Sequence, residues 1–131
     1  MLLDTAGLMC LLDEKDWRHD DAVRLYHATR LRLVTNYVLT EYVALAHVRG
    51  LSRQQTLAFS DAVLRDPNVE IIWVEKSLHQ QATNLLQARR DKTYSLCDAV
   101  SFILMRERGL SEALTTDKHF VQEGFIRLLE P

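Results

Sequence analysis

The 131-residue sequence predicts an α/β fold, a three-layer α/β/α sandwich around a mainly parallel sheet of five strands. Short apolar runs alternate with amphipathic stretches along the whole chain, and the amphipathic stretches repeat at helical spacing. With only four glycines and two prolines, no linker or low-complexity segment interrupts this alternation. Strands that alternate with helices favour a parallel sheet covered on both faces.

The amino-terminal half supplies two strands and four helices. A charged break at Asp13–Asp16 separates the first helical pattern from an amphipathic stretch that includes Trp17 among its apolar members. Gly50 is suited to end one helix, and Ser52 is suited to be the N-cap of the next. The elements predicted in this half are strand Met1–Leu3, helix Thr5–Leu12, helix Trp17–Thr29, strand Leu31–Val34, helix Tyr37–Arg49 and helix Ser52–Arg65.

The carboxy-terminal half supplies three further strands. A turn at Asp66-Pro67-Asn68 precedes the β-branched run Val69–Val74, which favours a strand. Gly109 ends the last long helix. The other elements predicted here are helix Ser77–Arg90, helix Ser95–Arg108, strand Ala113–Thr115, a helical turn at Lys118–Gln122 and strand Phe125–Leu129. In such a sheet the carboxyl ends of the strands share one edge, where ligands bind.

Composition sets limits on the class of protein. A chain of this length is expected to form one domain, residues 1–131. A net charge of −2 argues against a protein that coats nucleic acid by bulk charge alone. The apolar runs are too short for a membrane span, and Asp4 near the start argues against a secretory signal. We therefore expect a cytoplasmic protein in which Cys10 and Cys97 are reduced and buried.

Four acidic residues stand where an apolar run gives way to a helical pattern: Asp4, Glu41, Asp98 and Asp117. Carboxylates that converge on one spot repel each other unless a divalent cation lies between them. A metal-dependent reaction is therefore the first hypothesis, and it depends on whether the fold brings the four acids together.

Three of these acids have an ordinary alternative explanation as helix caps. Asp4 and Asp117 each precede a helical segment and could be N-caps. The pattern Ser95-x-x-Asp98 resembles a capping box with Asp98 at the N3 position. A carboxylate near a helix N-terminus is stabilised as an anion, which is also what a metal ligand requires. A cap and a ligand are therefore compatible roles.

Glu41 is harder to explain as a cap. On the predicted helix its neighbours three before, four after and seven after are Val38, Leu45 and Val48, which give it an apolar face. We therefore expect a partly buried carboxylate, which needs either a metal or a buried arginine as its partner.

The order and spacing of the four acids resemble the PIN-domain ribonucleases, and more narrowly the VapC-like toxins of toxin–antitoxin pairs. The resemblance lies in LLDTAGLMCLLD, TNYVLTEYVAL and DKTYSLCDAVSFILMRERGLSEALTTDKHFVQEGF, and it covers essentially the whole chain. It implies a PIN-like sandwich whose acidic pocket binds Mg²⁺ or Mn²⁺ and cleaves single-stranded or structured RNA. By the same resemblance the site residues are the quartet Asp4, Glu41, Asp98 and Asp117, with Thr5 and Thr115 in support.

Within that pocket we expect Asp4, Asp98 and Glu41 nearest the metal, with Asp117 acting through water. An activated water would attack the phosphodiester in line. Some members carry a further acid where this chain has His119, so one metal and two metals both remain open. The five histidines lack a zinc-binding spacing such as HExxH, which disfavours zinc.

The resemblance also implies partners. A cognate antitoxin would wrap the helices predicted at Tyr37–Arg49 and Ser52–Arg65, and the toxin would form a homodimer. Arg89, Arg90 and Lys92 precede the Asp98 helix and could guide phosphates to the pocket, or they could form a solvated basic turn.

Three other functions compete with RNA cleavage. A receiver-like domain needs a pair of carboxylates at the first strand end, and a dehalogenase-type phosphatase needs Asp-x-Asp there. Asp4-Thr5-Ala6 lacks both patterns. The third alternative, a non-catalytic module whose acidic pocket holds a partner's arginines, is compatible with the sequence.

Overall fold

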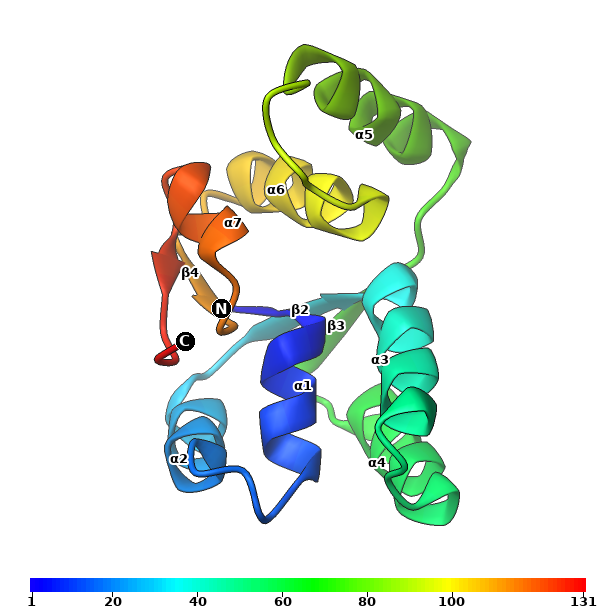
Figure 1. The fold of residues 1–131 in the computed structure, drawn as a ribbon, viewed down its shortest axis with the longest axis vertical. Coiled ribbons are helices and arrows are strands. Elements are labelled where there is room, and N and C mark those ends of the chain that lie inside the picture. Colours follow the sequence, from blue (N-terminus) through cyan, green and yellow to red (C-terminus); the bar gives the residue numbers. More distant parts are fainter.

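The computed structural model describes residues 1–131 and contains one five-stranded sheet in the order β3-β2-β1-β4-β5 (Figure 1). Every neighbouring pair of strands is parallel, so the predicted α/β class is confirmed and the sheet is wholly rather than mainly parallel. The strands are β1 (Leu2–Leu3), β2 (Arg32–Thr35), β3 (Val69–Ile72), β4 (Glu112–Leu114) and β5 (Ile126–Arg127).

Two groups of helices enclose this sheet. In Figure 1 the first four lie on one side of the sheet and the last three on the other. The helices are α1 (Thr5–Leu12), α2 (His19–Ala28), α3 (Asn36–Val48), α4 (Arg53–Arg65), α5 (Lys76–Ala88), α6 (Leu96–Arg108) and α7 (Lys118–Gln122). Ser52 is the N-cap of α4 and accepts a hydrogen bond from the Gln55 N–H, as predicted. Gly109 ends α6 in the left-handed conformation, with φ of 64°.

Several predicted boundaries differ from the structure by a few residues, and two of the differences have a local reason. Strand β3 ends at Ile72 because the backbone N–H of Val74 donates to the Asn36 side chain at 2.7 Å instead of to the sheet. Helix α2 begins at His19, so Trp17 lies outside it and is 66% exposed. The Asp16 carboxylate accepts from the backbone N–H of Arg18 at 2.9 Å, a local turn that competes with the helix at this point.

The buried side chains divide into two cores because side chains alternate across each strand. Leu3 and Val34 face the core under α1, α2, α3 and α4. Their strand neighbours Leu2 and Leu33 face the core under α5, α6 and α7. Each face of the sheet is therefore sealed by its own layer of helices, and the site must lie at an edge.

Helix α1 approaches strand β4 closely through Gly7. A Cβ atom at Gly7 would lie 2.0 Å from the Leu114 carbonyl oxygen, so no larger residue fits without movement. This contact fixes the start of α1, and with it Asp4, against the end of β4.

Cys10 and Cys97 are both free and buried, as predicted. None of the helices is both long and apolar enough to cross a membrane.

Candidate functional site

The candidate site lies where the central strand β1 and its neighbour β4 end. Asp4 directly follows β1, and Thr115 directly follows β4. From β1 the chain builds the sheet outwards through β2 and β3, and then returns to the other side of β1 for β4 and β5. Ligands of open α/β sheets bind at such a reversal of strand order.

Asp4 occupies the N-cap position of α1, but its side chain makes no capping hydrogen bond. Its carboxylate instead accepts a hydrogen bond from the Thr115 hydroxyl at 2.7 Å. The same hydroxyl accepts from the backbone N–H of Asp117 at 3.0 Å, so Thr115 links two acids of the predicted quartet. Burial raises the pKa of Asp4 to about 7, and the negative charges of Asp98 and Asp117 contribute to that rise.

Asp98 lies at the start of α6 and forms the predicted capping box. Its Oδ2 accepts from the backbone N–H of Ser95 at 2.9 Å, while the Ser95 hydroxyl accepts from the Asp98 N–H at 3.0 Å. Burial raises the pKa of this carboxyl, and the nearby Asp117 adds to that effect. The cap therefore fixes the side chain in a place where its negative charge is costly without a cation.

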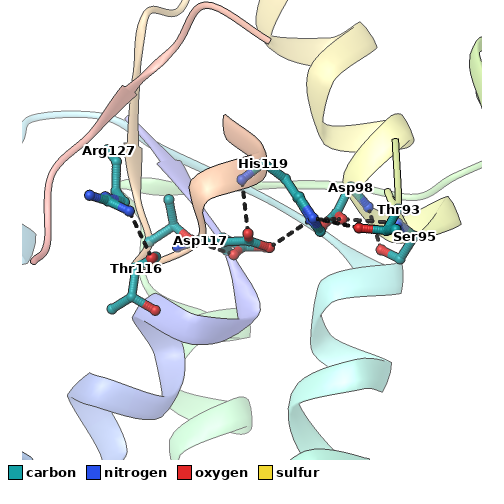
Figure 2. Close-up of polar contacts among 9 residues, drawn as sticks. Thr93, Ser95, Asp98, Thr116, Asp117, His119 and Arg127 are labelled. Atoms are coloured by element: carbon teal, nitrogen blue, oxygen red, sulfur yellow. Dashed lines mark hydrogen bonds and ion pairs between the residues drawn. The ribbon is translucent and has the colours of Figure 1, made fainter. Parts of the chain in front are cut away.

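Asp117 is the N-cap of α7, and its Oδ1 accepts from the backbone N–H of His119 at 2.9 Å. Its Oδ2 lies 3.3 Å from Nδ1 of His119, and Oδ2 of Asp98 lies 3.2 Å from the same nitrogen (Figure 2). One ligand atom from each of the three residues lies within 4.8 Å of the others. Asp98, Asp117 and His119 therefore form a cluster consistent with a metal site.

Glu41 is exposed, so the predicted partial burial was wrong. The buried stripe of α3 is centred on Val38 and Tyr42, and Val48, which was expected to share the face of Glu41, is 79% exposed. Burial raises the pKa of the Cys97 thiol, and the charge of the nearby Glu41 carboxylate adds to that rise. Glu41 therefore lies near the Asp98 helix, with its side chain open to solvent.

The three basic residues proposed as RNA contacts have different surroundings. Arg89 donates to the Glu123 carboxylate at 2.8 Å, which ties the end of α5 to the region after α7. Lys92 pairs with Asp91 at 3.3 Å, whereas the Arg90 side chain makes no ion pair. Arg90 is therefore the member of this group that is free to meet a phosphate.

The donor set fits a divalent cation. Carboxylate oxygens suit Mg²⁺ and Mn²⁺, and imidazole is a common ligand of Mn²⁺ and later metals. Burial, with a smaller contribution from neighbouring negative charge, raises the pKa of Asp4 and of Asp98, so a cation would stabilise their ionised forms. The hydroxyl of Thr5, beside Asp4, is buried without a hydrogen-bond partner.

The surface hollows lie away from these acids. One of about 200 Å³ lies at the opposite end of the strands, beside Met1 and Leu31. None of the hollows is lined by Asp4, Asp98 or Asp117. The acidic cluster is therefore not enclosed in a cavity of the kind that holds a small ligand.

The sequence did not identify His119 as part of the cluster. Histidine ligands are usually recognised as pairs at a metal-binding spacing, and His119 has no such partner. It joins the site through its position two residues after Asp117, in the first turn of α7. Two signals pointed to this position: the spacing Asp-x-His beside a strand end, and the further acid that some members of the resembling family carry where this chain has His119.

The chain resembles proteins of known activity over nearly its whole length. No protein-family model matches it. It is 30% identical over 129 residues to the 23S rRNA-specific endonuclease VapC20 of Mycobacterium tuberculosis strain CDC 1551 / Oshkosh, and the match covers 98% of this chain and 97% of the relative. The counterpart in strain ATCC 25618 / H37Rv matches equally well. The crystal structure of VapC20 from the same species, described as a sarcin–ricin loop-cleaving toxin, has a TM-score of 0.87 at 28% identity and covers 98% of both chains.

Proposed function

Since this chain belongs to the VapC family of PIN-domain toxin ribonucleases, we propose that it is a Mg²⁺- or Mn²⁺-dependent endoribonuclease that hydrolyses phosphodiester bonds. The observation that supports this most directly is the convergence of Asp98 and Asp117 on one point, with Asp4 joined to Asp117 through Thr115. These residues are far apart in sequence, and no helix cap requires them to meet. We propose that Glu41, whose side chain is exposed, completes the quartet.

The proposed substrate is a loop of structured RNA. The relative in Mycobacterium tuberculosis is named for its action on 23S rRNA, and we extend the class of substrate, ribosomal RNA, to this chain. A cluster that lies at the strand ends and outside any enclosed cavity suits a polymer that approaches from one side. Arg90 and Arg127, the second of which donates to the Thr116 carbonyl beside Asp117, are the basic side chains proposed to bind the RNA backbone.

When bound, a divalent cation supplies charge neutralisation and polarisation at the phosphoryl group. The chain's own contribution is to hold the carboxylates in fixed directions. The capping box orients Asp98, the N-cap bond orients Asp117, and the Thr115 hydroxyl orients Asp4. An ionised carboxylate has about four lone-pair sites on its two oxygens, so these contacts leave sites on each carboxylate for the cation.

We also propose that an antitoxin of the VapB type covers α3 and α4. Trp73, 65% exposed, and Leu64 form an apolar hollow with Val43 between these helices.

A homodimer is a separate proposal. Size-exclusion chromatography with light scattering tests it, and a monomer at micromolar concentration would contradict it.

The test of the proposed activity compares the purified protein with its Asp98→Asn variant on total RNA. We expect cleavage by the wild type with Mg²⁺ or Mn²⁺ and a loss of more than about 100-fold in the variant, because a charged ligand is removed. The variant should fold, because an asparagine oxygen can still accept from the Ser95 N–H. Its circular dichroism spectrum and melting temperature check this.

Asp61→Asn on the exposed side of α4 is the matched control, since it removes one carboxylate far from the cluster. This variant should cleave like the wild type. Equal cleavage by Asp98→Asn and wild type would refute the catalytic assignment. A pure wild type that leaves RNA intact with either metal would favour the non-catalytic module that holds a partner's arginines.

A further inference from the structure

The imidazole ring of His119 is held in a fixed position beside the acidic cluster. Its Nε2 lies 3.1 Å from the Thr93 hydroxyl, and its Nδ1 lies 3.2 Å from Asp98 (Figure 2). The ring packs edge-on against Tyr94, with 5.2 Å between ring centroids. Only 16% of the side chain is exposed. A histidine that merely covered the surface would not need contacts on both nitrogens.

The two ring nitrogens face different chemical groups. Nδ1 faces the carboxylates of Asp98 and Asp117, which only accept hydrogen bonds when ionised. Nε2 faces a hydroxyl, which can either donate or accept. When Nε2 carries the proton and donates it to Thr93, the Nδ1 lone pair points at two anionic oxygens. That arrangement is favourable only when a cation lies between them.

We propose that Nδ1 of His119 is a ligand of the divalent cation. Thr93 is the positioning residue, because its hydroxyl holds the ring in the tautomer whose Nδ1 can bind the cation. As a result of this nitrogen ligand, the centre prefers Mn²⁺ to Mg²⁺. The proposal rests on the proposed function, because it assumes a cation at Asp98 and Asp117. It adds a nitrogen ligand that the acidic quartet does not contain.

The preference follows from the chemistry of the donor. Mg²⁺ favours oxygen ligands and retains its waters, so an imidazole contributes little to its binding. Affinity for nitrogen donors rises along the first transition series, and Mn²⁺ lies at the start of that rise. A hydrogen bond from the second ring nitrogen also makes a metal-bound histidine a better ligand.

The opposing explanation is that His119 occupies the place of the cation. In that case the ring would compete with metal ions, and its removal would strengthen their binding. The two explanations therefore predict opposite changes in affinity for His119→Ala.

The experiment measures the Kd of Mn²⁺ and of Mg²⁺ by calorimetry on the full chain, for the wild type, His119→Ala, His119→Asp, Thr93→Val and Thr93→Ser. We expect His119→Ala to weaken Mn²⁺ binding about tenfold or more and Mg²⁺ binding much less. In His119→Asp, which offers oxygen instead of nitrogen, the preference for Mn²⁺ should fall about tenfold. Thr93→Val should weaken Mn²⁺ binding about tenfold, and Thr93→Ser should restore it because it keeps the hydroxyl.

A spectroscopic measurement reports the ligand directly. Electron spin-echo envelope modulation of bound Mn²⁺ should show coupling to a histidine nitrogen in the wild type and in Thr93→Ser. In His119→Asp it should show no nitrogen coupling. If Mn²⁺ binds without nitrogen coupling, or if His119→Ala binds Mn²⁺ as tightly as the wild type or tighter, the inference is wrong while the proposed function stands. If neither metal binds the wild type, the proposed function itself fails.

Discussion

At the scale of single residues, the centre holds buried carboxylates whose negative charge a cation would stabilise. Asp4 is buried near Asp98 and Asp117, and burial together with these two charges raises its pKa to about 7. A carboxyl with a raised pKa favours the folded state when protonated. Its contribution is therefore complete below about pH 4 and is lost as the pH rises through about 7.

We expect Asp4→Asn to be more stable than the wild type at pH 8 in the presence of a chelator. The asparagine keeps an acceptor for the Thr115 hydroxyl and removes the buried charge. The gain should be on the order of 2–4 kcal/mol, or about 7–15 °C in Tm, and it should vanish near pH 4. Thermal melts across this pH range measure it. A gain that is the same at every pH would exclude ionisation of Asp4 as its cause.

The residues of the centre differ in how far the sequence could predict their placement. The placement of Asp98 could be predicted, because its capping box lies within four consecutive residues. Glu41 was misjudged, because a helical face shared with apolar residues does not reveal which part of that face is covered. His119 depends on contacts with Asp98 and Thr93, which are 21 and 26 residues away in the chain, and no local pattern records such contacts.

At the scale of elements, the packing of α1 on β4 is the contact that brings Asp4 to Thr115. We expect Gly7→Ala to destabilise the protein by about 2–3 kcal/mol, because the added methyl group meets the Leu114 carbonyl at 2.0 Å. The midpoint of urea denaturation measures the change in stability.

The control for this change is Ala44→Gly on the exposed face of α3. It should cost about 1 kcal/mol through helix propensity alone. By helix propensity alone, Gly7→Ala should instead stabilise α1. If Gly7→Ala proves stabilising, the close approach of α1 to β4 is not rigid and our account of how Asp4 is positioned is wrong.

The segment between α5 and α6 contains two arginines with different roles. We expect Arg90→Ala to weaken RNA binding. The slope of the logarithm of the association constant against the logarithm of the salt concentration should become shallower by about 0.7–0.9 for each phosphate that the arginine neutralises. Arg89→Ala should mainly lower stability, because Arg89 is paired with the Glu123 carboxylate. Fluorescence anisotropy at several salt concentrations, in the Asp98→Asn background so that the RNA stays intact, distinguishes them. Identical salt slopes for Arg90→Ala and its parent would contradict a role for Arg90 in binding phosphate.

At the scale of the whole molecule, the fold class was predictable because alternating apolar and amphipathic segments allow few architectures. Each of the five predicted strands is present. The order β3-β2-β1-β4-β5 was not predicted, since it depends on which strands pair across long stretches of chain. That order is what places Asp4 beside Asp117.

Metal binding should stabilise the whole chain, because the proposed ligands come from widely separated parts of it. We expect Mn²⁺ at about 100 times its Kd to stabilise the protein by about 2.7 kcal/mol and to raise Tm by several degrees. A chelator should reverse the shift, and Asp98→Asn should show little of it. Differential scanning fluorimetry measures the effect. An equal shift in Asp98→Asn would mean that the ion binds elsewhere.

The hydrogen bond between Asp4 and Thr115 joins residues 111 positions apart. During synthesis, Thr115 is made only after the whole of β4, and Asp117 comes after it. A nascent chain therefore holds no complete centre until β4 and the turn that follows it have left the ribosome, however much of the first layer has folded. If this centre carries the proposed activity, the chain would be unable to cut RNA while that stretch of it is still being made.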